Sequence, residues 1–211
     1  MTVVAAIAKR ELMGFFASPV GWLCLVGFSL VSGLFFALMT SEFTVMAAQA
    51  AYNPYMADKV DVGLWLIQPY FANTAILLLM LAPAVTMRLF AEDRKQGSFE
   101  LLMASPIGSG QIACGKYLGA LGFMTAMVAT TLPFIGFLYW VHTPDTGLIL
   151  CGYAATWLMG AAFVAVGLLT SAMTENQIVA LILGFGMLLI VWLMSTADSM
   201  IGGTAGTVLA E

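Results

Sequence analysis

Long apolar stretches alternate with short polar segments along most of this chain. A helix that crosses a membrane needs about 20 mostly apolar residues. Five stretches reach that length, at about residues 19–40, 66–87, 117–141, 148–170 and 177–197. Because a helix satisfies its own backbone groups in lipid, the pattern predicts an all-α fold. We expect a polytopic membrane helical bundle with about five transmembrane helices, which together form a transmembrane domain over residues 19–197.

Composition agrees with a membrane protein. The 211 residues are 62% hydrophobic and only 9% charged, whereas a soluble domain carries about 25% charged residues. So few charges could not cover a surface that faces water on all sides. The seven basic residues are also too sparse for a nucleic-acid surface. We therefore expect no nucleic acid among the partners.

The positive charges orient the predicted bundle. Lys59 lies in one connecting segment, whereas the other six basic residues lie in alternate segments. Those six are Lys9, Arg10, Arg88, Arg94, Lys95 and Lys116. Segments on the cytoplasmic side carry the excess of Lys and Arg. The sequence therefore predicts a multi-pass inner-membrane protein with a cytoplasmic N-terminus, a cytoplasmic segment at residues 88–116, an outer loop at about 41–65 and a non-cytoplasmic tail at 198–211.

Acidic and basic residues are missing from the middle of every predicted transmembrane helix. Ion-driven transporters and proton pumps place ionisable residues at that depth. Transport by this chain would therefore need an outside source of energy.

The chain offers little for catalysis or metal binding. Its single histidine, His142, excludes a HExxH zinc motif, and the three cysteines form no CxxC pair. About 30 Å of membrane core separates His142 from Ser105 and Ser109, which excludes a Ser–His dyad between them. The chain also lacks the GxxxxGK[ST] phosphate loop of an ATPase. We expect no catalytic residue, no metal site and no cofactor in this chain.

The chain begins with an amphipathic segment, residues 1–18. Its apolar positions recur at helical spacing, which predicts a helix that lies along the cytoplasmic membrane surface and contacts lipid. Lys9 and Arg10 lie away from the apolar face, but Glu11 lies on it. Glu11 therefore either reaches water or pairs with a base from another cytoplasmic segment, Arg88 being one candidate.

The second transmembrane helix is predicted to continue out of the membrane through residues 88–96. Gly97 is a natural helix terminator, and a new short helix follows at 98–104 until Ser105-Pro106 ends it. Such a short helix has little stability alone. Its apolar face suits docking in a partner's groove, although the same face also suits the membrane surface or the bundle.

Small residues recur at four-residue spacing, for example at Gly115 and Gly119 or at Ser29, Gly33 and Ala37. This spacing lets helix backbones approach closely. It fits either packing within one bundle or a contact between two subunits.

Residues 88–106 resemble the cytoplasmic signature of ABC-2 type permeases. The pattern is a glutamate, a basic stretch, Gly-Ser, a second glutamate, Leu-Leu and then Ser-Pro. The N-terminal block Lys9-Arg10-Glu11-Leu12 is similar to that of the gliding-motility-associated permease subgroup. The resemblance covers nearly the whole chain, and its specific part is residues 88–116.

The resemblance implies a membrane-spanning permease subunit of an ABC transporter, driven by a separate ATPase subunit that binds ATP and Mg and powers substrate export. A second permease subunit would complete a homo- or heterodimer, and a periplasmic or accessory protein is a possible partner of the outer loop. The short helix would be the coupling helix. The residues expected at the ATPase-coupling interface are Arg88, Glu92, Arg94, Lys95, Gly97, Ser98, Phe99, Glu100, Leu101, Leu102, Ser105 and Pro106, beside Lys9, Arg10 and Glu11 of the interfacial helix.

Permeases of this family usually have six transmembrane helices. The tail at 198–211 fits the start of the re-entrant region that precedes the sixth helix. Two other functions stay open: a membrane scaffold or assembly protein that moves no substrate, and a passive pore.

Overall fold

The computed structural model describes residues 3–52, 60–95, 97, 108–141 and 143–208, with side chains as far as residue 194. Every regular element in this part of the chain is a helix. In chain order they are α1 (Val3–Ala17), α2 (Pro19–Tyr52), η1 (Gly63–Ile67), α4 (Gln68–Thr86), α5 (Arg88–Lys95), α7 (Ser109–Ala129), α8 (Leu132–Val141), α9 (Thr146–Ala172) and α10 (Gln177–Val208).

Five stretches are long and apolar enough to cross a membrane, in agreement with the sequence. They are Pro19–Tyr52, Gly63–Lys95, Ser109–Val141, Thr146–Ala172 and Gln177–Met194. The protein is therefore a multi-pass helical membrane protein.

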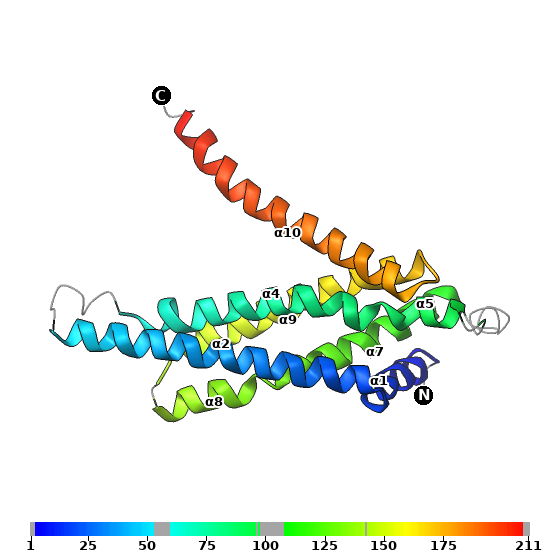
Figure 1. The fold of residues 1–211 in the computed structure, drawn as a ribbon, viewed down its shortest axis with the longest axis horizontal. Coiled ribbons are helices and arrows are strands. Elements are labelled where there is room, and N and C mark those ends of the chain that lie inside the picture. The colour runs from blue at the N-terminus through cyan, green and yellow to red at the C-terminus, as the bar shows by residue number, and fades with distance from the viewer. Residues whose placement is uncertain (1–2, 53–59, 96, 98–107, 142, 209–211) are drawn as a thin grey trace.

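The helices run lengthwise beside one another, except for the first and the last (Figure 1). Helix α1 turns back at the start of α2 and packs mainly on α7. Helix α10 begins beside α5 and the end of α9 and then diverges from the bundle. One end of the bundle therefore collects α1, α5, the start of α7 and the α9–α10 turn, and we call it the charged end.

Helix α2 is longer than the sequence predicted. We expected it to end near residue 40 and to be followed by a loop over 41–65, but the helix continues to Tyr52. The polar residues past residue 40 do not stop it, because their hydroxyls bond carbonyls of the same helix. Ser41 Oγ donates to Leu38 O and Thr44 Oγ1 donates to Ser41 O, each at 2.7 Å.

Two apolar clusters follow one another along the bundle. The larger surrounds Phe28, Leu78 and Phe123 and reaches the charged end through Phe15 and Leu89. The smaller, which we call the aromatic half, joins α2, η1, α4, α8 and α9. Its buried members are Phe36, Leu66, Ile67, Tyr70, Phe71, Ile135, Leu138 and Ile149.

Candidate functional site

Two glycines of α7 let α1 lie directly against it. A Cβ at Gly115 would fall 2.7 Å from Ile7 Cβ, and a Cβ at Gly119 would fall 2.6 Å from Glu11 Cβ. Real Cβ atoms do not approach so closely, so only glycine fits at either place. The small-residue spacing that the sequence left open is, for this pair, a packing contact within the chain.

Between these glycines lies Lys116, which is only 1% exposed. Its Nζ lies 2.6 Å from Asp93 Oδ2 of α5 and 3.0 Å from Glu11 Oε1 of α1. The same nitrogen donates a hydrogen bond to the carbonyl of Leu89. We call Lys116, Glu11 and Asp93 the Lys116 cluster. It joins α5 and α7 to α1, whose Glu11 is 105 positions from Lys116 in the sequence.

The surroundings of Glu11 favour its ionised form. Burial raises the pKa of Glu11, but Lys116 and Arg10 outweigh this, and the net pKa lies below the ordinary value of a glutamate. The hydrogen bond from Arg10 Nη2 to Glu11 Oε1, at 2.8 Å, is also the main cause that raises the pKa of Arg10. Glu11 is therefore a carboxylate at neutral pH.

A buried ammonium without partners would cost several kcal/mol of desolvation. Lys116 is tolerated because two carboxylates and one carbonyl surround it. Removal of one partner leaves the buried ammonium with fewer groups that compensate its lost hydration. The position of α1 relative to α5 is consequently fixed by the geometry of this cluster.

The sequence left two options open for Glu11, and the structure shows the second. Glu11 does pair with a base from another segment, but that base is Lys116 and not Arg88. Arg88 instead places its guanidinium 4.2 Å above the centre of the Phe15 ring. Phe15 in turn stacks on Phe123 of α7, with ring centres 4.7 Å apart.

A fully buried serine joins α5 to the end of α9. Ser171 Oγ accepts from the backbone N–H of Phe90 at 3.0 Å and of Ala91 at 3.2 Å, and it donates to Met87 O at 3.0 Å. These groups lie at the junction of α4 and α5, where the helix hydrogen-bond ladder is interrupted. Ser171 thus replaces the missing bonds and holds the start of α5 against α9.

The predicted coupling residues fall into two groups. Arg88, Glu92, Arg94 and Lys95 lie on α5, and Gly97 follows it with φ +70°, a conformation that favours glycine. Gly97 N donates to Arg94 O at 3.1 Å, which confirms the predicted end of this helix. The remaining predicted residues lie outside the described part of the chain: Ser98, Phe99, Glu100, Leu101, Leu102, Ser105 and Pro106.

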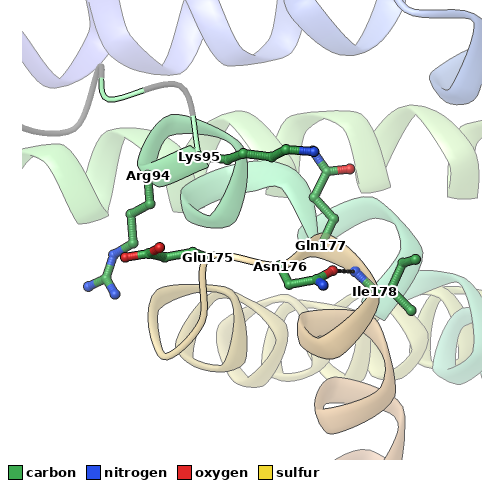
Figure 2. A pocket seen from close by; sticks show the side chains of 6 residues that line it. All are labelled: Arg94, Lys95, Glu175, Asn176, Gln177 and Ile178. Carbon is green, nitrogen blue, oxygen red and sulfur yellow. Dashed lines mark hydrogen bonds between the residues drawn. The ribbon is translucent and has the colours of Figure 1, made fainter.

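A hollow of about 560 Å³ lies beside the end of α5 (Figure 2). Arg94 and Lys95 line it on one side, and the α9–α10 turn, Glu175 to Ile178, lines it on the other. The sequence analysis did not single out this turn. Its polar run Thr-Glu-Asn-Gln between two long apolar stretches was the available signal.

The sequence analysis used Lys116 only to orient the bundle. Its spacing between two glycines was the signal that a neighbouring helix comes close at this point. Among the described residues, no group of three or more His, Cys, Asp or Glu side chains is placed to hold a metal ion.

These contacts describe a helical membrane protein in which α1, α5, α7 and α9 are joined at one end of the bundle. A comparison with known families identifies the family. The profile described as "ABC-2 family transporter protein" matches residues 5–206. The chain therefore belongs to the ABC-2 transporter family and is a permease component of an ABC transporter. No curated protein and no solved structure matches the chain.

Proposed function

We propose that this chain couples ATP hydrolysis by a separate ATPase subunit to the export of a substrate across the inner membrane. In this proposal the charged end faces the cytoplasm and receives the ATPase. The observation that carries it is the Lys116 cluster, which ties α1, α5 and α7 together next to the segment that resembles a coupling helix.

The route of the motion follows from the contacts at the charged end. A push on residues 98–106 reaches α5 first, because α5 ends at Lys95, shortly before that segment in the sequence. From α5, Asp93 passes the displacement to Lys116 on α7 and through it to Glu11 on α1. Ser171 passes it to α9. Four helices of the charged end would therefore move together.

The sequence of the membrane-spanning stretches supports ATP as the energy source. Apart from Lys116 at the charged end, the stretches 63–87, 109–141, 146–172 and 177–194 contain no Lys, Arg, Asp or Glu. Ion coupling uses such residues within the membrane. ATP hydrolysis in a partner subunit, where ATP and Mg would bind, supplies the work instead.

The proposal also covers the orientation of the chain in the membrane, its oligomeric state and its subgroup within the family. Six of the seven basic residues favour a cytoplasmic charged end by the positive-inside rule. A second permease subunit would complete the membrane pathway. The N-terminal Lys9-Arg10-Glu11-Leu12 block supports membership of the gliding-motility-associated subgroup.

The test is copurification of the tagged chain from detergent-solubilised membranes, with mass spectrometry for a P-loop ATPase. Besides the wild type, it uses the double variant Leu101→Asp and Leu102→Asp. Tyr52→Asp, at a residue that is 92% exposed outside the charged end, is the control. We expect the ATPase with the wild type and the control but not with the double variant.

Two results would contradict the proposal. A folded wild-type chain that brings down no P-loop ATPase would exclude ATP-driven coupling and favour a scaffold or a passive pore. An ATPase that stays bound to the double variant would exclude residues 98–106 as the docking segment. A scaffold that does bind the ATPase would show no ATP-dependent change in the membrane helices.

A further inference from the structure

The third membrane-spanning stretch is divided into α7 and α8 at Thr130–Thr131 (Figure 1). Pro133, in the first turn of α8, has no N–H group to donate, so the helix hydrogen-bond ladder is interrupted there. Both threonine hydroxyls bond carbonyls on the α7 side of the break. Thr130 Oγ1 donates to Met127 O at 2.7 Å. Thr131 Oγ1 donates to Val128 O at the same distance. The stretch therefore contains a joint whose threonine hydroxyls have partners within the helix, as the lipid environment requires.

Helix α8 is tied to α9 at both of its ends by pairs of hydroxyl groups. At the joint, Thr131 Oγ1 lies 3.0 Å from Tyr153 Oη. At the other end, Tyr139 Oη donates to Thr146 Oγ1 at 3.1 Å. Thr131 is 1% exposed, whereas Tyr139 is 42% exposed. An exposed hydrogen bond is easily exchanged for another partner, so the joint is the natural pivot and the far end of α8 is the end that can move.

An apolar groove of about 620 Å³ lies between α8 and α2. Its wall on α2 is a row of small residues, Gly33, Ala37 and Ser41, which share one side of the helix because they are four positions apart. The hydroxyl of Ser41 donates to a carbonyl of α2 itself, so it needs no partner across the groove. The wall on α8 carries the rings of Phe134 and Phe137. Rings therefore face small residues along the groove.

The groove is closed near the joint and open farther along. The ring of Phe134 already sits on α2: a Cβ at Gly33 would fall 2.9 Å from Phe134 Cζ, and this ring stacks on Phe36 with centres 5.8 Å apart. One turn farther along α8, Phe137 is 50% exposed, and Ala37 on α2 is exposed as well. The pairing of a ring with a small residue is thus made at Gly33 and left open at Ala37.

We propose that α8 is a hinged half-helix that pivots at Thr130–Thr131 and closes onto α2, with the ring of Phe137 over Ala37. Helices in lipid associate through close packing around small residues, and closure extends such packing by one turn. The exposed bond between Tyr139 and Thr146 is given up in exchange. The groove is filled by α8 itself, because Phe137 follows on the same helix as the ring already seated at Gly33.

The hinge goes beyond the proposed function, because it needs no ATPase partner. It gives the aromatic half two arrangements that differ in named contacts. In the open arrangement, which the structure shows, Tyr139 bonds Thr146 and the groove is empty of protein. In the closed arrangement, Phe137 covers Ala37. The half of the bundle away from the charged end would thus change shape while the charged end keeps its own contacts.

The experiment measures one distance by electron spin resonance in the full chain in lipid nanodiscs. Labelled chain is diluted with unlabelled chain, so that each distance lies within one molecule. The labels replace Leu38 on α2 and Trp140 on α8, which are exposed and do not line the groove, in a background without the three native cysteines. We expect two distances in the wild type, of which the shorter belongs to the closed arrangement.

Filling the groove should prevent closure. In Ala37→Phe the new ring takes the space that Phe137 would enter, so we expect the shorter distance to disappear. Leu34→Phe adds a ring one turn earlier on α2, at an exposed residue that does not line the groove, and is the matched control. The control should keep both distances. Equal thermal unfolding of the two variants shows that the loss is not misfolding.

Releasing the far end of α8 should favour closure. Tyr139→Phe removes the hydroxyl that bonds Thr146 and leaves the ring in place. We expect the ratio of closed to open molecules to rise about threefold, the effect of one average hydrogen bond between membrane helices. Tyr52→Phe, at a residue that is 92% exposed, is the control and should leave the ratio unchanged.

Three results would overturn the inference. A single distance that is the same in the wild type and in Tyr139→Phe would show that α8 is fixed and that lipid fills the groove. Two distances that both persist in Ala37→Phe would show that α8 moves without entering the groove. Loss of the shorter distance in Leu34→Phe as well would show that the effect is not specific to the groove. None of these results depends on ATPase binding, so the inference and the proposed function fail separately.

Discussion

The charged end and the aromatic half are held together by different kinds of contact. At the charged end, a buried ion cluster and two glycines fix α1 on α7, and each of these contacts requires one particular residue. In the aromatic half, rings of neighbouring helices contact at centre distances of 5.0 Å for Phe71 and Tyr153 and 5.8 Å for Phe36 and Phe134.

The difference has a consequence for how each region responds to force. Ion pairs and glycine contacts have one good geometry, so we expect the charged end to transmit a displacement without rearranging. Apolar contact between rings does not require one exact geometry, so we expect neighbouring helices of the aromatic half to shift by small amounts. The third membrane-spanning stretch is also divided at Thr130–Thr131 into α7 and α8, so the aromatic half contains a joint. We expect substitutions to be severe at the charged end and mild in the aromatic half.

The largest effect is expected for Lys116→Met, which removes the cation that lies between Asp93 and Glu11 and leaves Glu11 with Arg10 as its basic partner. Removing one partner of a buried ion pair destabilises by about 3 kcal/mol, at the lower edge of the usual range because both carboxylates are partly exposed. Thermal unfolding in detergent measures the loss. Lys9→Met, at an exposed residue of α1, is the control and should be neutral. Equal stability of the two variants would refute the structural role of the cluster.

Gly119→Leu should displace α1 from α7, because even a Cβ at this position meets Glu11 and Ala8. We expect a loss of about 2 kcal/mol from overpacking. Displacement of α1 exposes the backbone at Lys9 and Arg10, so trypsin should cut there faster than in the wild type. Gly110→Leu on the same helix, where a Cβ meets nothing within 4 Å, is the control. Slow cleavage in both variants would contradict the close contact.

Ser171→Ala should destabilise by about 1.5 kcal/mol, since it leaves two buried backbone N–H groups without an acceptor. Beyond unfolding, the variant tests coupling. If Ser171 joins α5 to α9, ATP hydrolysis by the bound ATPase should continue while substrate export falls. If the variant exported as much substrate per ATP hydrolysed as the wild type, Ser171 would not transmit motion from α5 to α9.

Ser32→Ala in the aromatic half makes the direct comparison, because Ser32 is as fully buried as Ser171. Its hydroxyl makes one side-chain contact, 2.9 Å to Tyr70 Oη. A hydrogen bond between membrane helices contributes about 0.6 kcal/mol on average. We therefore expect a smaller shift in unfolding than for Ser171→Ala. A larger shift for Ser32→Ala than for Ser171→Ala would contradict the expected difference between the two regions.

The smallest effect is a dependence on pH. The pKa of Glu11 is lowered below its ordinary value of 4.5, so the stability that it contributes is fully present above that value. This contribution is lost as the pH falls through the lowered pKa. The stability of the wild type against unfolding should change little between about pH 7 and pH 5. Below that range it should fall more steeply than the stability of Glu11→Gln. Parallel curves for the two proteins would contradict the pairing with Lys116.

Much of this architecture was predictable, because periodicity and length report local structure. The five membrane-spanning stretches, the amphipathic α1 and the end of α5 at Gly97 all follow from residues that are neighbours in the sequence. The extension of α2 to Tyr52 was missed, because the predicted helix was ended where the long apolar run ends, near residue 40. In the structure the threonine hydroxyls in this region bond their own helix.

The parts that the sequence did not reveal depend on contacts between distant segments. Glu11 meets Lys116 across 105 positions, and Ser171 meets Phe90 across 81. Neither pairing leaves a periodic pattern, and Lys116 was simply one more positive charge at the edge of a transmembrane helix. The hollow beside Arg94 was likewise hidden, since its second wall is a turn whose position depends on how α9 packs.

The most direct test of the account is a pair of distances in the complex with its ATPase, reconstituted in lipid nanodiscs. Spin labels at Lys9 and Gly110 report on α1 and α7, and a label at Trp140 reports on α8, in a background that lacks the three native cysteines. The account predicts that ATP with vanadate leaves the 9–110 distance unchanged and alters the 9–140 distance. A 9–110 distance that changes as much as the other would show that the charged end does not move as one body. No change in either distance while ATP is bound would contradict the predicted motion of the charged end relative to α8.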